Sequence, residues 1–140
     1  MSDLSRLDIF IRIIDANFNR AKEALRVSED FARFALKDEK LTASFKKCRH
    51  DLTELILELP ITYRKMLDVR DSEKDVGRDG WIQDGKKNPE WQDLMTSNLK
   101  RSQEALRVLE EVTKSVMPRQ SPKFQRLRFR VYELEKRSFA

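Results

Sequence analysis

Apolar side chains recur every three to four residues in two stretches of the chain that are copies of one another. Residues 17–30 and 98–111 align with a shift of 81 positions, and eight of the fourteen aligned positions are identical. At about 100° per residue, the spacing places the apolar side chains of each copy on one face of a helix. The pattern therefore predicts two related amphipathic helices. The residues of these faces are Ala21, Ala24, Leu25, Val27, Ser28 and Phe31 in one copy, and Ser102, Ala105, Leu106, Val108, Leu109 and Val112 in the other.

Polar residues interrupt both faces at matching positions. Asn17 and Asn98 project from the middle of the apolar face, where an amide without hydrogen-bond partners costs about 1–3 kcal/mol. An arginine and a glutamate lie along one shoulder of each face, where we expect half-buried side chains; these are Arg20 with Glu23 and Arg101 with Glu104. Two interpretations remain open. The copies could form a pocket, or they could be a duplicated helical hairpin in which these groups only fix the register.

The remaining apolar pattern predicts further helices. Residues 3–14 are predicted to begin a helix. It continues into the first copy directly, or after a break near Asp15, which could cap a new helix. The helix that contains the first copy then ends near residues 37–38. A second helix runs from about Glu39 to Leu59 and is stopped by Pro60.

The second half of the chain contains two more helix signals. Asn88, as N-cap, followed by Pro89 predicts a third helix from about residue 89 to 116, and Ser121 with Pro122 begins the last one. Between residues 61 and 87 the helical period disappears. The fold class is therefore predicted to be all-α: a single domain over residues 1–140, built as a bundle of four main helices with an internal helix repeat and one long loop between helices.

Composition supports this fold and limits the function classes. Charged residues make up 38% of the chain, and there are only three glycines and four prolines, which favours helices over tight β-turns. The net charge of +5 is a mild basic excess that suits phosphorylated ligands as well as nucleic acid. Basic and acidic residues alternate throughout, which makes a poor nucleic-acid footprint.

The single cysteine and the N-terminal sequence indicate the compartment. Cys48 has no partner for an internal disulfide, and one cysteine with one histidine makes no zinc pattern. The longest apolar run is only a few residues, and the N-terminus lacks the layout of a signal peptide. We expect a cytoplasmic protein that neither crosses nor enters a membrane.

Two other charged features are expected to be structural. His50, the only histidine, lies between Arg49 and Asp51 on the second helix, where a capped or partnered histidine is a more common finding than a catalytic one. The last helix carries a basic stripe that we interpret as a solvated face. Its residues are Arg126, Arg128 and Arg130.

The long loop is dense in charge and offers candidate ligands. Arginine side chains in it could bind phosphates, and its aspartates could bind magnesium, whereas no glycine-rich phosphate loop can be built from it. Like charges crowd residues 68–80, and Gly77 and Gly80 supply hinges, so this segment is predicted to be a flap that closes over bound ligands. The crowded carboxylates are Asp68, Asp71, Asp75 and Asp79.

Four motifs along the chain match those of a known family in their order and spacing. They resemble a small helical domain of bacterial thiamine biosynthesis, which is found alone or fused ahead of thiamine-phosphate synthase. The motifs are the run from Arg12 to Phe34, Arg49-His50-Asp51-Leu52, Arg70-Asp71 with Asp75-Val76-Gly77, and Asn98-x-x-Arg101-x-x-Glu104-Ala105-Leu106-Arg107-Val108-Leu109-Glu110-Glu111.

The resemblance implies an ATP-dependent kinase that phosphorylates hydroxymethylpyrimidine phosphate to the diphosphate, with ATP and Mg²⁺ as cofactors. Phosphoryl transfer depends mainly on positioning and on neutralising charge, so arginines, carboxylates and a metal are sufficient. The expected catalytic residues are Arg20, Arg101 and Asp71, the substrate-binding residues are Asn17, Asn98, Glu23, Glu104, Arg70 and Gly77, and the metal ligands are Asp71 and Asp75.

The alternative is a non-catalytic helical module that dimerises or docks on thiamine-phosphate synthase and supports it. A docking bundle has no need of a charged, glycine-containing loop, so the loop favours the kinase. Thiamine-phosphate synthase is a candidate partner in either case, a homo-oligomer stays open, and neither nucleic acid nor a membrane is expected as a partner.

Overall fold

The computed structural model describes residues 5–78 and 88–140, and within these ranges the chain is helical without any strand. The all-α prediction is confirmed. Residues 63–69, however, form a short helix in the stretch predicted to lack regular structure. The elements are α1 (Arg6–Phe34), α2 (Glu39–Leu57), α3 (Tyr63–Val69), α4 (Trp91–Val116), the 3₁₀ turn η1 (Pro118–Gln120) and α5 (Ser121–Ser138).

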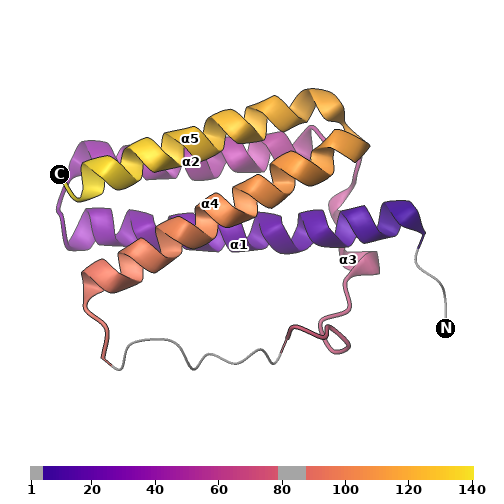
Figure 1. Cartoon of the computed structure of the whole chain (residues 1–140), viewed down its shortest axis with the longest axis horizontal. Coiled ribbons are helices and arrows are strands. Elements are labelled where there is room, and N and C mark those ends of the chain that lie inside the picture. Colours follow the sequence, from indigo (N-terminus) through magenta and orange to yellow (C-terminus); the bar gives the residue numbers. More distant parts are fainter. Residues whose placement is uncertain (1–4, 79–87) are drawn as a thin grey trace.

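The four long helices form a bundle in which sequence neighbours and repeat partners both lie in contact (Figure 1). Helix α1 packs against α2 and α4, and α5 packs against α4 and α2. Helices α1 and α4, which hold the two copies of the repeat, run in opposite directions and cross, and α5 lies beside α4 in front of the more distant α2 (Figure 1). The two copies of the repeat therefore pack against one another as an antiparallel, crossed pair.

Side-chain caps define where the first three helices begin. Ser5 accepts a hydrogen bond from the Asp8 amide (3.1 Å), and Asp38 accepts one from the Leu41 amide (2.9 Å). Thr62 caps α3 in the same way. Of the two alternatives left open near Asp15, the direct continuation into the first copy is confirmed, because α1 runs through this position without interruption. Helix α2 ends two residues before the predicted Leu59, in a tight turn that precedes Pro60.

The start of α4 differs from the prediction by two residues. Asn88 has a positive φ of 56° and is not the N-cap. Glu90 takes that place, and its backbone N–H donates to the Asp93 carboxylate (3.2 Å) in a capping box. Asparagine tolerates the left-handed conformation, so Asn88 serves the turn that leads into the helix rather than the helix itself.

All four long helices share one hydrophobic core. Leu25 and Leu106, equivalent residues of the two copies, are both fully buried in it. Phe45 of α2 and Phe124 of α5 are the largest fully buried side chains. Burial of these residues in one cluster confirms that the two copies belong to a single core.

The second helix of each half also repeats, with a shift of 79 rather than 81 positions. Phe45 and Arg49 of α2 correspond to Phe124 and Arg128 of α5 in a shared pattern, Phe-x-x-apolar-Arg-x-x-apolar. Each arginine pairs with the equivalent glutamate of the preceding long helix. The distances are 3.2 Å for Arg49 to Glu29 and 2.9 Å for Arg128 to Glu110. The fold is therefore a duplicated helical hairpin, and the duplication extends beyond the predicted repeat.

These pairs correct the interpretation of the C-terminal arginines as a solvated stripe. Arg128 is buried with only 7% of its surface exposed, and it donates to Glu110. Arg130 donates to Asp51 of α2 at 2.8 Å. Only Arg126 is exposed as predicted. The stripe was misread because alternate residues of a helix point to different sides, one of which faces α4.

Candidate functional site

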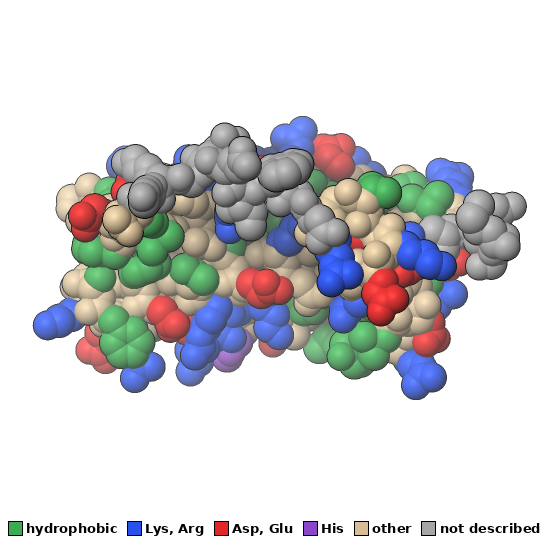
Figure 2. All heavy atoms as spheres, turned by 90° about the horizontal axis from the view of Figure 1, so that it is seen from below, with side chains coloured by type: hydrophobic (Ala, Val, Ile, Leu, Met, Phe, Trp, Pro, Cys, Tyr) green, Lys and Arg blue, Asp and Glu red, His purple; other side chains and the backbone are tan. Residues whose placement is uncertain are grey.

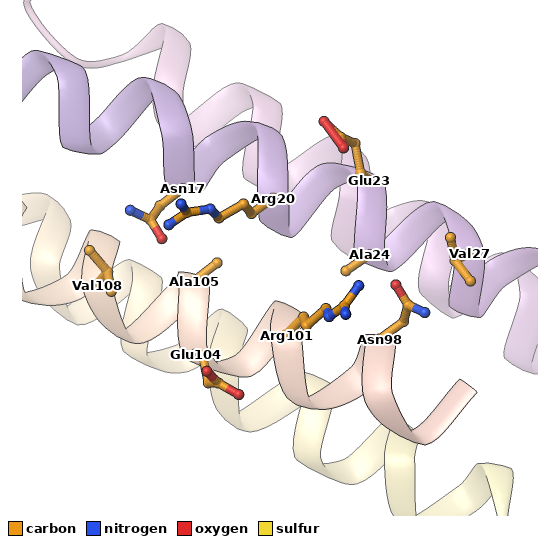
Figure 3. A pocket seen from close by; sticks show the side chains of 10 residues that line it. All are labelled: Asn17, Arg20, Glu23, Ala24, Val27, Asn98, Arg101, Glu104, Ala105 and Val108. Atoms are coloured by element: carbon orange, nitrogen blue, oxygen red, sulfur yellow. The ribbon is translucent and has the colours of Figure 1, made fainter. Parts of the chain in front are cut away.

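A cavity of about 550 Å³ opens where α1 and α4 cross. Every residue that lines it on α1 has its repeat equivalent, 81 positions later, lining it on α4. The five pairs are Asn17 and Asn98, Arg20 and Arg101, Glu23 and Glu104, Ala24 and Ala105, and Val27 and Val108 (Figure 3). The crossing thus relates the two sides of the cavity by an approximate two-fold axis.

The cavity divides into two equivalent half-sites. In the Asn17 half-site, Asn17 and Arg20 of α1 face Ala105 and Val108 of α4 (Figure 3). The Asn98 half-site has Asn98 and Arg101 of α4 opposite Ala24 and Val27 of α1 (Figure 3). Each half-site therefore combines an amide and a cation from one helix with an apolar wall from the other. The sequence placed the alanines and valines on the helix faces but did not show that they line a cavity.

The two asparagines are held in the same way. The Asn17 amide nitrogen donates to the Ile13 carbonyl at 2.9 Å, and the Asn98 amide nitrogen donates to the Leu94 carbonyl at 2.8 Å. Only an amide N–H can donate to a carbonyl, so these bonds fix the orientation of both side chains. The carbonyl oxygen of each asparagine is directed towards the opposite helix (Figure 3). Each half-site thus presents a hydrogen-bond acceptor to a ligand.

The arginines of the cavity have no acidic partner among the residues that the structure describes. Glu23 and Glu104 do not pair with them, and among residues 5–78 and 88–140 neither Arg20 nor Arg101 forms an ion pair. All four side chains are exposed rather than half-buried as predicted, and the glutamates point outward from the rim (Figure 3). Two uncompensated guanidinium groups in one cavity favour a ligand with several negative charges.

The other two repeat arginines face away from the cavity. Arg26 is exposed and pairs with Glu29 at 3.3 Å and with Asp30 at 3.7 Å. Its equivalent, Arg107, is exposed and pairs with Glu111 at 3.1 Å. These residues are matched controls for Arg20 and Arg101, because they carry the same charge on the same two helices outside the cavity.

A stacked aromatic pair lies beyond the Asn98 end of the cavity. Phe31 follows Val27 by one helical turn, Trp91 precedes Asn98 by two turns, and their rings stack with centroids 6.1 Å apart. The repeat equivalents at the other end are Phe10, which is half-buried, and Val112, which is buried. The approximate symmetry is therefore incomplete: two aromatic rings lie beyond the Asn98 half-site, and one occupies the equivalent positions beyond the Asn17 half-site.

Three of the four loop residues predicted to belong to the site line a second, smaller cavity. It measures about 220 Å³, and α1 contributes Asp15 and Asn19 to its wall, opposite Arg70, Asp71 and Asp75. Arg70 binds Asp15 with two hydrogen bonds of 2.7 and 2.8 Å, so its charge is already compensated. No local sequence pattern indicates this partner, because 55 residues separate Asp15 from Arg70.

The predicted magnesium ligands are engaged locally. Asp71 accepts a hydrogen bond from the Lys74 amide (3.2 Å), and Asp75 accepts one from the Gly77 amide (2.8 Å). Gly77 is exposed and lines neither cavity. Over the described residues, no group of three or more histidine, cysteine, aspartate or glutamate side chains is placed to hold a metal. Asp79 and Gly80 of the predicted flap lie outside the described residues.

His50 is not part of either cavity. It is exposed and makes no hydrogen bond or ion pair within the described ranges, so the prediction of a partnered histidine is wrong. Its neighbours fan out as expected, Arg49 towards α1 and Asp51 towards α5. His50 simply occupies the solvent side of α2.

The surface carries no large field of one sign on the face seen in Figure 2. Blue and red side chains are interspersed there with apolar ones (Figure 2). This distribution agrees with the poor nucleic-acid footprint predicted from the sequence. No helix in the part of the chain that the structure describes is long and apolar enough to span a membrane.

Comparison with known proteins places this architecture in a family. Thiamine-phosphate synthase from Synechocystis sp. is 38% identical over 124 residues, which are 89% of this chain and 34% of the relative. The corresponding proteins of Thermosynechococcus vestitus and Prochlorococcus marinus are 36% and 34% identical over the same lengths and shares. The chain thus spans about a third of these relatives. No solved structure matches it. The model of the ThiD2 family matches residues 12–137, and the chain belongs to that family.

Proposed function

We propose that this protein is a kinase that transfers the γ-phosphoryl group of ATP to hydroxymethylpyrimidine phosphate. The product, a pyrimidine diphosphate, is the form that a thiamine-phosphate synthase would consume. The observation that carries the proposal is the α1–α4 cavity, in which two arginines without acidic partners lie beside two oriented amides. Such a cavity suits ligands that combine a phosphate with a nitrogen-containing ring.

The chemistry of the acceptor explains why the cavity needs no general base. A phosphate monoester has its second pKa near 6, so its attacking oxygen is largely ionised at pH 7. That oxygen forms a bond to the γ-phosphorus, and the bond from this phosphorus to the β–γ bridging oxygen breaks, releasing ADP. Phosphoryl transfer of this kind is accelerated chiefly by positioning and by stabilising charge. Arg20 and Arg101 would supply both by donating hydrogen bonds to phosphate oxygens.

The loop residues that line the second cavity fit a role in holding magnesium. Mg²⁺ in kinases is commonly bound by one or two carboxylates together with substrate phosphates and water. Asp71 and Asp75 supply two such carboxylates, each with one oxygen outside the local hydrogen bonds described above. When bound, Mg²⁺ would neutralise phosphate charge. Arg70, already paired with Asp15, would anchor these aspartates to α1 rather than bind phosphate.

A coupled assay for ADP release tests the proposal directly. We expect release with Mg·ATP and the pyrimidine monophosphate, and only background release with unphosphorylated pyrimidine or without an acceptor. Phosphorus NMR of the same mixtures should show the pyrimidine diphosphate. Absence of turnover from a folded protein with all reactants present would contradict the proposal.

One observation favours a second candidate, a module that supports thiamine-phosphate synthase without catalysing a reaction. The relatives carry the name of that enzyme, and this chain corresponds to about a third of each. The supporting module would raise the activity of a separately supplied synthase with pyrimidine diphosphate as substrate. The kinase would raise product formation only when the synthase is supplied with the monophosphate and ATP.

A further inference from the structure

The α1–α4 cavity is lined by repeat-equivalent residues: each lining residue on one helix has its equivalent on the other. A two-fold arrangement of this kind offers the same chemistry twice. Each half-site supplies one amide carbonyl oxygen, one guanidinium group and one wall formed by an alanine and a valine (Figure 3). Two ligands of similar chemistry could therefore bind in equivalent ways.

The two reactants of the proposed kinase have this similarity. Adenine contains an aminopyrimidine ring with an exocyclic amine, and so does the hydroxymethylpyrimidine, and each reactant carries phosphate. An asparagine amide can accept a hydrogen bond from an exocyclic amine and donate one to the adjacent ring nitrogen, as it does in reading adenine. The Asn17 and Asn98 nitrogens each use one N–H for a helix carbonyl, which leaves the second N–H and the oxygen for a ligand.

We propose that the two half-sites each bind one reactant, with the aminopyrimidine ring on the asparagine and the phosphate on the arginine of the same helix. This inference rests on the proposed kinase function. Because the half-sites are related by an approximate two-fold axis, ligands bound in equivalent poses lie head to head. In the structure each guanidinium group extends towards the asparagine of its own helix (Figure 3). Both arginines are exposed, so in the proposed complex each turns towards the axis with its phosphate. With both rings at the outer ends, the phosphates of the two reactants then meet at the axis, which is the geometry that transfer between them requires.

The ends of the cavity decide which reactant occupies which half-site. The nucleotide has the larger ring system and an additional ribose, so it needs the more open end and more surface for stacking. The Asn98 half-site provides both: Asn98 is only half-buried, and two stacked rings, Phe31 and Trp91, lie beyond it, whereas the equivalent positions at the other end are Phe10 and the buried Val112. Asn17 is buried with 5% of its surface exposed. The smaller pyrimidine phosphate therefore occupies the Asn17 half-site.

Binding measurements on single variants test this division. Isothermal calorimetry would use a non-hydrolysable ATP analogue with Mg²⁺, and the pyrimidine monophosphate, each titrated separately. We expect Asn98→Ala to lower the affinity for the nucleotide analogue at least tenfold and the affinity for the pyrimidine phosphate less than threefold. Asn17→Ala should show the reverse. Ser97→Ala, next to Asn98 but outside the cavity, should change neither affinity. The melting temperature of each variant shows that it is folded.

A ligand that lacks the exocyclic amine isolates the contact itself. Purine riboside triphosphate should bind the wild type about tenfold more weakly than ATP, and Asn98→Ala should remove this difference, whereas Asn17→Ala should keep it. If one variant fails to fold, the test still applies, because the ratio of the affinities for ATP and purine riboside triphosphate can be measured on the other variant and on the wild type.

The results separate this inference from the proposed function. In one outcome, the wild type turns over both reactants but each asparagine variant loses affinity for both ligands equally, or Asn98→Ala mainly loses the pyrimidine phosphate and Asn17→Ala the nucleotide. That outcome overturns the division into half-sites and leaves the kinase proposal intact. If the wild type neither turns over nor binds the reactants, the kinase proposal fails, and the division fails with it.

Discussion

The Arg128 guanidinium donates a 2.9 Å hydrogen bond to the Glu110 carboxylate, and the side chains of both are more than nine-tenths buried between α4 and α5. Its counterpart in the first hairpin joins Arg49 to Glu29. The sequence shift between the two arginines differs from that between the two glutamates, yet the same pair forms twice. The hairpins are therefore built around equivalent charge pairs as well as equivalent apolar faces.

Removing Arg128 leaves the Glu110 carboxylate buried with only a longer ion pair, 3.8 Å from the exposed Arg107. We expect Arg128→Met to lower the free energy of unfolding by about 3–5 kcal/mol, measured by urea denaturation. Arg126→Met, two residues earlier on an exposed site, should change it by less than about 0.5 kcal/mol. Equal losses in both variants would show that the Glu110 pair contributes nothing specific.

Truncation of a repeat leucine tests the shared core. Leu25→Ala and Leu106→Ala should each cost about 2–5 kcal/mol, because both side chains are fully buried and the bundle can close the resulting cavity only in part. Val27→Ala, at a more exposed position of the same helix face, should cost far less. The measurement is again urea denaturation. A small loss at either leucine would mean that its side of the core repacks freely.

Substitutions of the two cavity arginines should lower activity without lowering stability. Arg20→Ala and Arg101→Ala should each lower kcat/KM for phosphoryl transfer at least tenfold, equivalent to about 1.4 kcal/mol of transition-state binding. The melting temperature should stay the same or rise, since neither arginine has an ion-pair partner in the part of the chain described.

Arg26→Ala and Arg107→Ala are the matched controls for this experiment. They should retain the activity of the wild type, because both residues face away from the cavity. Loss of stability with unchanged turnover in the cavity variants would rule out a phosphate-binding role for Arg20 and Arg101.

The thiol of Cys48 should react slowly in the folded protein. Desolvation by burial raises the pKa of Cys48, so little of the reactive thiolate is present at pH 8. We expect Ellman's reagent to modify it at least tenfold more slowly in the native protein than in urea. Equal rates would show that the packing around Cys48 opens readily to solvent in the native protein.

The Asp51–Arg130 pair should make stability depend on acid. Partial desolvation acts to raise the pKa of Asp51, but hydrogen bonds from Arg130 and Lys47 outweigh it and hold that pKa below its usual value. A lowered folded pKa stabilises the protein above the unfolded value of about 3.9, and this contribution disappears as the pH falls through the folded pKa. Both side chains are partly exposed, so we expect no more than about 1 kcal/mol.

Asp51→Asn should lack this contribution. Its melting temperature should lie below that of the wild type at pH 6, and the difference should shrink as the pH falls below 4. A difference that is constant between pH 6 and pH 3 would assign the effect to packing rather than to ionisation.

Much of the helical framework was predictable from the sequence because it depends on local spacing. The 3.6-residue period of apolar positions sets which face of a helix is buried, and the repeat at 81 residues indicated that two faces were related. Prolines and capping residues marked most helix ends to within two residues. The equivalence of Asn17 with Asn98 and of Arg20 with Arg101 was visible in the same alignment.

Only the tertiary structure decided what those residues do to one another. Whether two equivalent faces enclose a cavity depends on the angle at which α1 and α4 cross, and no local pattern encodes that angle. Long-range pairs such as Arg70 with Asp15 and Arg128 with Glu110 form because whole helices pack together. Arg70, predicted to bind substrate, and Arg128, predicted to face solvent, are therefore both in structural ion pairs. A charged side chain takes its partner from whichever element packs against it, and packing joins residues that are distant in the chain.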